Sequence, residues 1–380
     1  MIYLDNAATS FPKPEACFRR GLEDYLALGA SPGRGGYDAA ARSQARVREV
    51  RERVADFFGA SGCVTCFGHN ATDALNTLVL GLARPGSHVV STRLEHNSVL
   101  RPLHHLRQTG ACELDLVPFG PDGLVGSEMV AQALRPHTCL VVMTHASNVL
   151  GTVQPVEAVG RLCRERGIPL VLDISQSAGV VPIRMRDWGA SALAFTGHKG
   201  LLGPTGVGGL VMEPGLEVLP SRFGGTGLDS LSLTHNLDLP ERLEAGTLNL
   251  LGILTLGHCL DYLQGPLALE LAQKEMELHG RLLEGLAALP GVTVDCPGSG
   301  PGRLPLVSCN LEGWDPSEAG MVLDGDYSIA VRAGLHCAPL AHQDLGHGAK
   351  GSLRVSLGRY NTQAHVDAFL RAAGAMLRGQ

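Results

Sequence analysis

The chain has 380 residues and a formal net charge of −6, with 44% hydrophobic and 18% charged residues. This composition is typical of a soluble globular protein, and the length favours a large domain plus a smaller one. We expect no nucleic-acid partner, no membrane span, no signal peptide and no disulfide framework among the ten cysteines, which together favour a cytoplasmic protein.

The first half of the chain predicts alternating helices and strands. Residues Asp38 to Phe58 form an amphipathic pattern with Val47, Val50 and Val54 on one face. Short apolar runs follow at His88–Ser91, Leu114–Val117, Cys139–Thr144, Pro169–Ile174, Ala192–Thr196 and Val207–Met212, with helical stretches such as Pro155–Arg166 between several of them. Buried runs of this length predict an α/β fold whose mainly parallel sheet has helices on both faces.

The pattern changes after about residue 260. One long helix is predicted over Leu267–Leu289 and a final helix over Thr362–Leu377. Between them, short strands are predicted at Val292–Asp295, Leu306–Leu311, Ile329–Arg332 and Leu353–Leu357. We therefore expect a large domain over residues 15–255, and a small α+β domain built from residues 1–14 and 256–380.

A lysine and an aspartate follow two of the predicted strands. Asp173 ends the run Pro169–Ile174, and Lys199 comes shortly after Thr196. Burial lowers the pKa of a lysine toward that of a reactive amine, which can form a Schiff base with an aldehyde cofactor. A buried carboxylate needs a cationic partner, and a pyridinium nitrogen is one, so the pair suits pyridoxal phosphate (PLP). Thr144, Asp173 and Thr196 all end strands, where ligands bind in such sheets.

A second site element joins the apolar segment Cys63–Phe67 to a helix that begins near Thr72. Backbone N–H groups at a helix N-terminus, with a threonine hydroxyl, form a cradle for phosphate. Most such sequences are only helix caps, so this signal is weak alone. Cys63 and Cys66 would give a metal only two ligands, and core positions are the favoured interpretation.

Eight segments together resemble PLP enzymes of aminotransferase class V, and the downstream ones resemble group II cysteine desulfurases. They are Tyr3–Ser10, Leu94–Ser98, Thr144–Thr152, Asp173–Gly179, Thr196–Lys199, Glu244–Thr247, Arg332–Cys337 and Leu353–Gly358. The resemblance covers essentially the whole chain, with the motifs in the expected order. It implies PLP fold type I, with a mostly parallel seven-stranded sheet in the large domain.

The resemblance also implies roles around the cofactor ring. Lys199 would hold PLP covalently and then move the Cα proton of the substrate. Asp173 would keep the pyridine nitrogen protonated, and Gln176 would bind the phenolic oxygen of the ring. His96 would stack on the ring face and is a candidate proton shuttle, because an unperturbed histidine titrates near neutrality.

The resemblance also implies which residues hold the phosphate of the cofactor and the carboxylate of the substrate. The phosphate would be held by Ala71, Thr72, Thr196 and His198, and by Thr247 of the neighbouring subunit of a homodimer. The substrate carboxylate would be held by Asn148 and Arg354, with Arg332 close by; arginine suits bidentate recognition of carboxylates. The substrate implied is L-cysteine, with L-selenocysteine as a possible second one.

Cys337 is the residue that decides the reaction. In the desulfurases, a loop cysteine attacks the sulfur of the substrate, which yields alanine and an enzyme persulfide. We expect His336 and Arg332 to favour the thiolate form. The interval from Cys337 to Arg354 is short, as in group II enzymes, and it implies a compact loop with a dedicated sulfur-acceptor protein, in iron–sulfur cluster assembly or another pathway.

Several features leave alternatives open. The sequence departs from the usual family pattern at Gly33, Ala71 and Leu335, which leaves substrate range open. His342 and His347 follow Cys337 closely; we expect solvated loop histidines there and no metal site. A selenocysteine lyase, an epimerase, an aminotransferase or a catalytically silent assembly subunit are the alternative functions.

Overall fold

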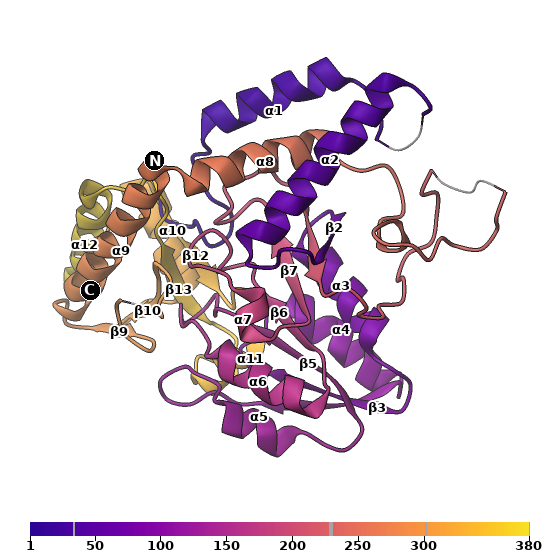
Figure 1. Cartoon of the computed structure of the whole chain (residues 1–380). Helices are drawn as coiled ribbons and strands as arrows, with labels where there is room; N and C mark the ends of the chain where they lie inside the picture. The colour runs from indigo at the N-terminus through magenta and orange to yellow at the C-terminus, as the bar shows by residue number, and fades with distance from the viewer. Residues whose placement is uncertain (33–34, 228–230, 301, 380) are drawn as a thin grey trace.

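The computed structural model describes residues 1–32, 35–227, 231–300 and 302–379, and its centre is a seven-stranded sheet (Figure 1). The strands are β2 (Val64–Gly68), β3 (Ser87–Thr92), β4 (Cys112–Val117), β5 (Thr138–Thr144), β6 (Leu170–Asp173), β7 (Ala192–Thr196) and β8 (Gly208–Met212), in the order β2-β8-β7-β6-β5-β3-β4. β8 runs antiparallel to both β2 and β7, and the other neighbouring pairs of this sheet are parallel. The predicted α/β class and the mainly parallel sheet are confirmed.

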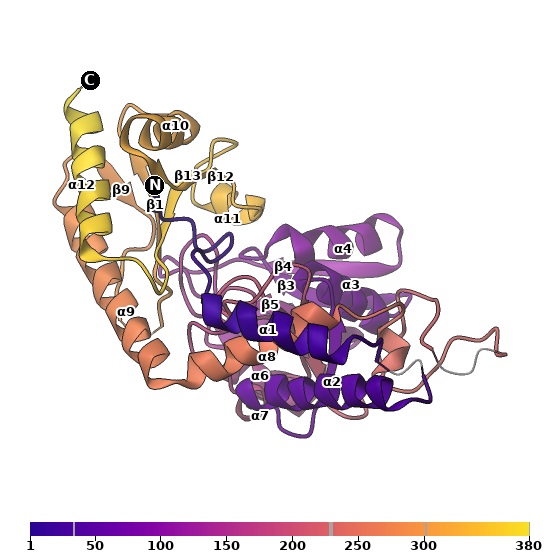
Figure 2. The ribbon, with the colours of Figure 1, turned by 90° about the horizontal axis from the view of Figure 1, so that it is seen from above.

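The sheet is buried on both faces because its strands alternate between two hydrophobic cores. Along β6, Leu170 and Leu172 belong to one core and Val171 to the other. The first core includes side chains of α2 (Asp38–Phe57), α5 (Ser127–Ala133), α6 (Val156–Arg166) and α7 (Met185–Trp188), and the second those of α3 (Ala71–Leu82) and α4 (Asn97–Gln108). Figure 2 shows the two helical layers on opposite sides of the strands. This two-sided burial explains why the strands read as continuous apolar runs.

The small domain is built around a second sheet. Its four-stranded sheet has the order β12-β13-β10-β9, and β1 pairs in parallel with β11. The bounds are β1 (Ile2–Tyr3), β9 (Val292–Val294), β10 (Leu306–Leu311), β11 (Ile329–Ala330), β12 (Arg332–Gly334) and β13 (Ser352–Ser356). The helices are α9 (Pro266–Ala287), α10 (Pro316–Tyr327), α11 (Pro339–Asp344) and α12 (Gln363–Arg378).

One predicted strand of this domain is wrong. The run Ile329–Arg332 is not one strand, because the chain leaves β1 after Ala330 and pairs with β13 from Arg332 onward.

The domain boundary at residue 255 stays a prediction. Leu260 and Leu263 of α8 (Leu250–Gln264) still pack in the core of the large sheet, whereas Leu4 packs in the core of the small domain.

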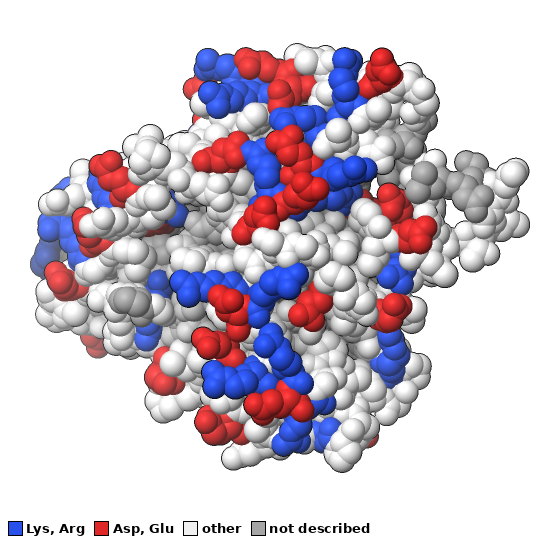
Figure 3. Space-filling model, in the orientation of Figure 1, with Lys and Arg blue, Asp and Glu red and all other residues white. Residues whose placement is uncertain are grey.

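The outermost helices are held together by charge pairs as well as by apolar contacts. Arg46 of α2 lies 3.1 Å from Asp24 of α1 (Glu15–Leu28), and Arg53 of α2 pairs with Asp261 of α8. Basic and acidic side chains are interspersed on the face in Figure 3. Within the described ranges, none of the helices has the length and apolar character needed to cross a bilayer.

A buried ion pair joins α2 to the segment of Glu244. The two terminal nitrogens of Arg51 donate to the two carboxylate oxygens of Glu244, each at 2.5 Å, and the Phe67 N–H donates to the same carboxylate. The Arg51 guanidinium also lies 4.9 Å from the centre of the Phe67 ring. Removing either partner would leave a charge buried without its counter-ion.

We therefore predict that Glu244→Ala lowers the free energy of unfolding by about 3–5 kcal/mol, because the Arg51 charge loses its partner. Urea denaturation monitored by circular dichroism measures this. Glu15→Ala is the matched control: its ion pair with Arg19 is exposed, and such a pair contributes about 0.5 kcal/mol or less. A loss below about 1 kcal/mol for Glu244→Ala would contradict the prediction.

Candidate active site

A cavity of about 290 Å³ lies at the carboxyl ends of the central strands. Side chains from both domains line it, and they include eleven of the residues that the sequence singled out: Ala71, Thr72, His96, Asn148, Asp173, Gln176, Thr196, His198, Lys199, Arg332 and Arg354. Thr144 lines it as well, so the three strand ends meet as expected. Cys337 and Thr247 do not line this cavity.

Lys199 is buried in the cavity wall, and its pKa is lowered to about 8. Burial is the main cause, and the nearby Asp173 carboxylate partly opposes it. Asp173 is itself held in place by Ser175, whose N–H and hydroxyl both donate to Oδ1, at 2.9 and 2.5 Å. The amine of Lys199 is therefore partly neutral near neutral pH, as a nucleophile or base must be.

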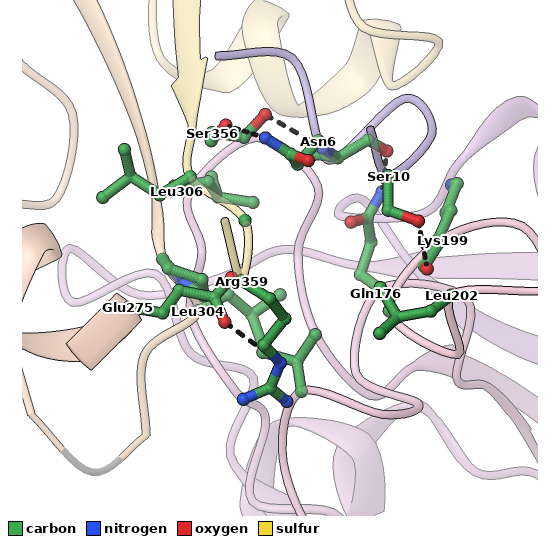
Figure 4. A pocket seen from close by; sticks show the side chains of 16 residues that line it. Asn6, Ser10, Gln176, Lys199, Leu202, Glu275, Leu304, Leu306, Ser356 and Arg359 are labelled. Carbon is green, nitrogen blue, oxygen red and sulfur yellow. Dashed lines mark hydrogen bonds and ion pairs between the residues drawn. The ribbon is translucent and has the colours of Figure 1, made fainter. Parts of the chain in front are cut away.

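The chain's N-terminal segment holds the backbone of the lysine loop. Ser10 Oγ donates to the carbonyl of Lys199 at 2.9 Å, as Figure 4 shows. The carbonyl of His198 accepts from Thr9 Oγ1 at 3.0 Å and from Lys13 Nζ at 2.7 Å. In the sequence, the N-terminal motif carries only a family resemblance, and this contact could not be predicted because no spacing rule connects segments so far apart.

His96 is the N-cap of α4 and faces the same cavity. Its Nδ1 accepts the N–H of Ser98 at 3.0 Å. Burial lowers the pKa of His96 to about 4, and the charge of Lys199 acts in the same direction. The imidazole is thus neutral at pH 7, so the near-neutral titration that suggested a proton shuttle is not kept in the folded chain.

One end of the cavity fits the phosphate of the cofactor that the resemblance implies. The N-terminus of α3 opens onto it, and the Thr72 hydroxyl lies 2.7 Å from that of Ser98. Thr196 Oγ1 and His198 Nδ1 are buried and have no hydrogen-bond partner among the described residues. Buried polar atoms are costly without a partner, so this end of the cavity fits an anion. Ser98 was not singled out as a site residue from the sequence.

The other end of the cavity is cationic. Arg332 of β12 and Arg354 of β13 are directly opposed in the register of the two strands. Arg354 donates to Asp5 Oδ1 and to the carbonyl of Asn148, each at 3.0 Å, while its Nε has no partner within the described residues. The amide of Asn148 already donates to the carbonyl of His336 at 2.6 Å. A carboxylate therefore fits beside Arg354.

Cys337 lies next to the cavity, in a separate hollow of about 420 Å³ between α3 and α4. Thr72, His96 and Ser98 line both spaces. The Cys337 carbonyl accepts the N–H of Asn97 at 2.7 Å, and its Sγ lies 3.9 Å from Arg332 Nη2.

The expectation that His336 helps Cys337 with a positive charge is wrong. His336 is 3% exposed, and burial lowers its pKa to about 2, so the ring is uncharged. Its Nε2 lies 3.1 Å from the carbonyl of Ser352, on the side of the small domain. Arg332 is thus the cation in contact with the sulfur.

Three other expectations have mixed outcomes. His342 is fully buried rather than solvated, because its ring lies between those of His336 and His347. In the described part of the chain, no group of three or more metal-binding side chains is arranged to hold an ion. Cys66 is buried, Cys63 is partly so, and both are free. Gly33 lies outside the described residues.

Thr247 lies away from the cavity in its own chain. It lines a hollow of about 220 Å³ with Ser31, Arg51 and Glu244. A role at a phosphate is therefore open to it only in a neighbouring subunit, as the resemblance implies. That role stays a prediction.

The comparison with known proteins agrees with this geometry. The family described as aminotransferase class V matches residues 2–369. A probable cysteine desulfurase of Methanothermobacter thermautotrophicus is 34% identical over 96% of this chain and 92% of its own length. A cysteine desulfurase of Klebsiella pneumoniae is 32% identical over 97% of this chain and 91% of its own.

Solved structures show the same likeness. The apo structure of a cysteine desulfurase from Thermococcus onnurineus superposes with a TM-score of 0.92 at 32% identity, and covers 100% of this chain and 95% of that one. A cysteine desulfurase from Escherichia coli gives 0.87 at 26% identity, with coverage of 99% and 94%. The chain therefore belongs to the aminotransferase class V family, beside relatives that are named cysteine desulfurases.

Proposed function

We propose that the chain is a PLP-dependent cysteine desulfurase that converts L-cysteine to L-alanine and carries the sulfur on Cys337. The observation that carries this is the buried amine of Lys199 beside Asp173, between an anion-binding end and an arginine end of one cavity. The names of the relatives support the same reaction. When bound, PLP supplies an electron sink that lets a proton leave the substrate Cα.

Lys199 is then the residue that binds the cofactor and moves the proton at Cα. Its lowered pKa supports this role, because a base works best when its pKa lies near the working pH. Asp173 would balance the positive charge of the pyridine nitrogen, and Gln176, which also lines the cavity, would bind the ring. His96 is neutral and lines the same cavity, so it would cover one ring face.

The two ends of the cavity orient the bound molecules. Thr72, Thr196 and His198 hold the phosphate with the N–H groups of α3, of which Ala71 is the first residue. Arg354 holds the substrate carboxylate through its unpaired Nε and neighbouring nitrogens, with Asn148 and Arg332 beside it. Fixing both ends leaves the Cα proton and the β-substituent in a defined position, which lowers the entropy cost of reaction.

Cys337 takes the sulfur in the last step. Its thiolate attacks the substrate sulfur: a sulfur–sulfur bond forms, the Cβ–sulfur bond breaks, and a proton replaces sulfur on Cβ. Alanine leaves, and the persulfide remains for a sulfur-acceptor protein, in iron–sulfur cluster assembly or another thiolation pathway. The contact of Cys337 Sγ with Arg332 supports this role, because it holds the sulfur in a defined position at the edge of the site. We place this chemistry in the cytoplasm.

A second copy of the chain completes the site in this proposal. The segment before Glu244 exposes several large apolar side chains, and Figure 1 shows it extending away from the body of the molecule. They are Leu219, Phe223, Leu231, Leu233 and Leu237. Exposed apolar side chains gathered on one segment are typical of an interaction surface. Thr247, which follows this segment, would then reach the phosphate end of the partner's cavity.

We expect a dimer in light scattering at micromolar concentration. Leu233→Glu should shift the protein toward monomer, because a charge would be buried in the contact, and should weaken PLP binding in parallel. Leu267→Glu, at an exposed position on α9, is the matched control and should stay dimeric. A wild-type monomer that binds PLP fully would contradict the proposal.

The reactivity of Lys199 should follow pH with a midpoint near 8 in the apoprotein, since burial lowers its pKa to about 8. Trace acetylation followed by peptide mass spectrometry measures this, with the exposed Lys274 as internal reference. Asp173→Asn should move the midpoint to lower pH, because it removes the anion that favours the charged amine. A higher midpoint in Asp173→Asn would contradict this assignment.

Cys337→Ala should keep the absorption of bound PLP and lose at least about 100-fold in alanine release from L-cysteine, because the nucleophile is gone. Alanine and sulfide are measured with a reductant present, and the assay is repeated with L-selenocysteine. Unchanged alanine release from L-cysteine would refute the persulfide route. Activity of the wild type on L-selenocysteine alone would favour a lyase, and a keto-acid product would indicate an aminotransferase.

A further inference from the structure

A column of buried and partly buried side chains lies behind Cys337, and none of them has a role in the reaction described above. It consists of His336, His342, His347 and Asp295, and we call it the histidine column. The ring centres of His336 and His342 lie 5.3 Å apart, as do those of His342 and His347. His342 Nδ1 lies 3.0 Å from His347 Nδ1, and His347 Nε2 lies 3.1 Å from Asp295 Oδ1.

These contacts connect the side chains in one line. One proton joins His342 Nδ1 to His347 Nδ1, whichever ring carries it, and His347 Nε2 faces Asp295 Oδ1. His336 donates its Nε2 proton to the Ser352 carbonyl. His342 Nε2 and His336 Nδ1 have no hydrogen-bond partner among the residues described. The orientation of the His342 ring therefore depends on its single bond to His347.

The column supports a loop that would not hold its shape alone. His336 and Cys337 have φ values of 49° and 61°, in the left-handed region that residues other than glycine rarely adopt. Such a conformation persists only where the surroundings enforce it. Asn148 and Asn97 hold the carbonyls of His336 and Cys337 from the large domain. On the opposite side, the His336 ring packs on His342, whose helix α11 follows Cys337 directly.

We propose that His342, oriented by His347 and Asp295, is a positioning residue that holds the His336 ring and thereby keeps the Cys337 sulfur beside Arg332. The inference rests on the proposed role of Cys337 in sulfur transfer. His342 itself does not line the cavity that takes the cofactor, but His336 does. The balance between turnover and KM therefore separates an effect on the sulfur step from an effect on substrate binding.

His342→Phe tests this in the PLP-loaded enzyme, because phenylalanine keeps a ring of similar size and removes the bond to His347. Turnover of L-cysteine should fall about tenfold or more with KM within about twofold, since a displaced nucleophile costs rate rather than affinity. Alkylation of Cys337 by iodoacetamide, followed by peptide mass spectrometry, should slow about threefold as the sulfur leaves Arg332. Cys139, near the amino end of β5 and only partly buried, is the internal reference.

Two further variants keep the result interpretable. Asp295→Asn leaves both rings in place and should slow alkylation in the same direction, which tests the column even where His342→Phe folds poorly. His279→Phe replaces another buried histidine, on α9, and should leave turnover and alkylation unchanged.

Wild-type turnover and alkylation rates in His342→Phe and Asp295→Asn would overturn the inference, and so would an equal change in His279→Phe. Failure of the proposed function is a different result: Cys337→Ala would then release alanine normally. The alkylation rates report on the loop in either case, because they do not depend on the reaction that the enzyme catalyses.

Discussion

An amine that is buried at the carboxyl ends of a sheet's strands loses either its charge or its hydration. Lys199 carries such an amine, and the rest of the site is arranged around it. Burial lowers the pKa of Lys199 to about 8, and Asp173 limits the shift. Asp173 ends β6 and Lys199 follows β7; these two strands are neighbours and are covered on both faces. A strand edge exposed to solvent would leave this lysine permanently charged and unreactive.

The same site also depends on the contact between the two domains. The N-terminal segment begins in the small domain, where Leu4 is in the core. Within a few residues, Asp5 pairs with Arg354 and Ser10 holds the carbonyl of Lys199. One short segment therefore fixes the cationic end of the cavity and the lysine loop together. A shift of the small domain would change both at once, so domain packing and site geometry are coupled.

The backbone of the Cys337 loop is strained, and contacts from both domains hold it in place. Two consecutive left-handed residues place the sulfur beside Arg332, and hydrogen bonds from Asn97 and Asn148 hold the loop from the large domain. His336 and His342 behind it are uncharged because burial lowers their pKa values. The cation nearest the sulfur is thus supplied by a strand of the small domain and not by the loop itself.

The sequence by itself determined the order of helices and strands, the two-sided burial of the sheet and the strand ends at the cavity, because apolar periodicity is a local property. Most of the other cavity residues were implied by the resemblance to class V enzymes. The sequence also indicated Lys199 and Asp173 by chemistry alone. Tertiary structure decided the rest. The split between β11 and β12 depends on which distant strand each residue pairs with. The neutrality of His336 and the burial of His342 depend on neighbours packed from elsewhere in the chain, and burial is what sets their pKa values.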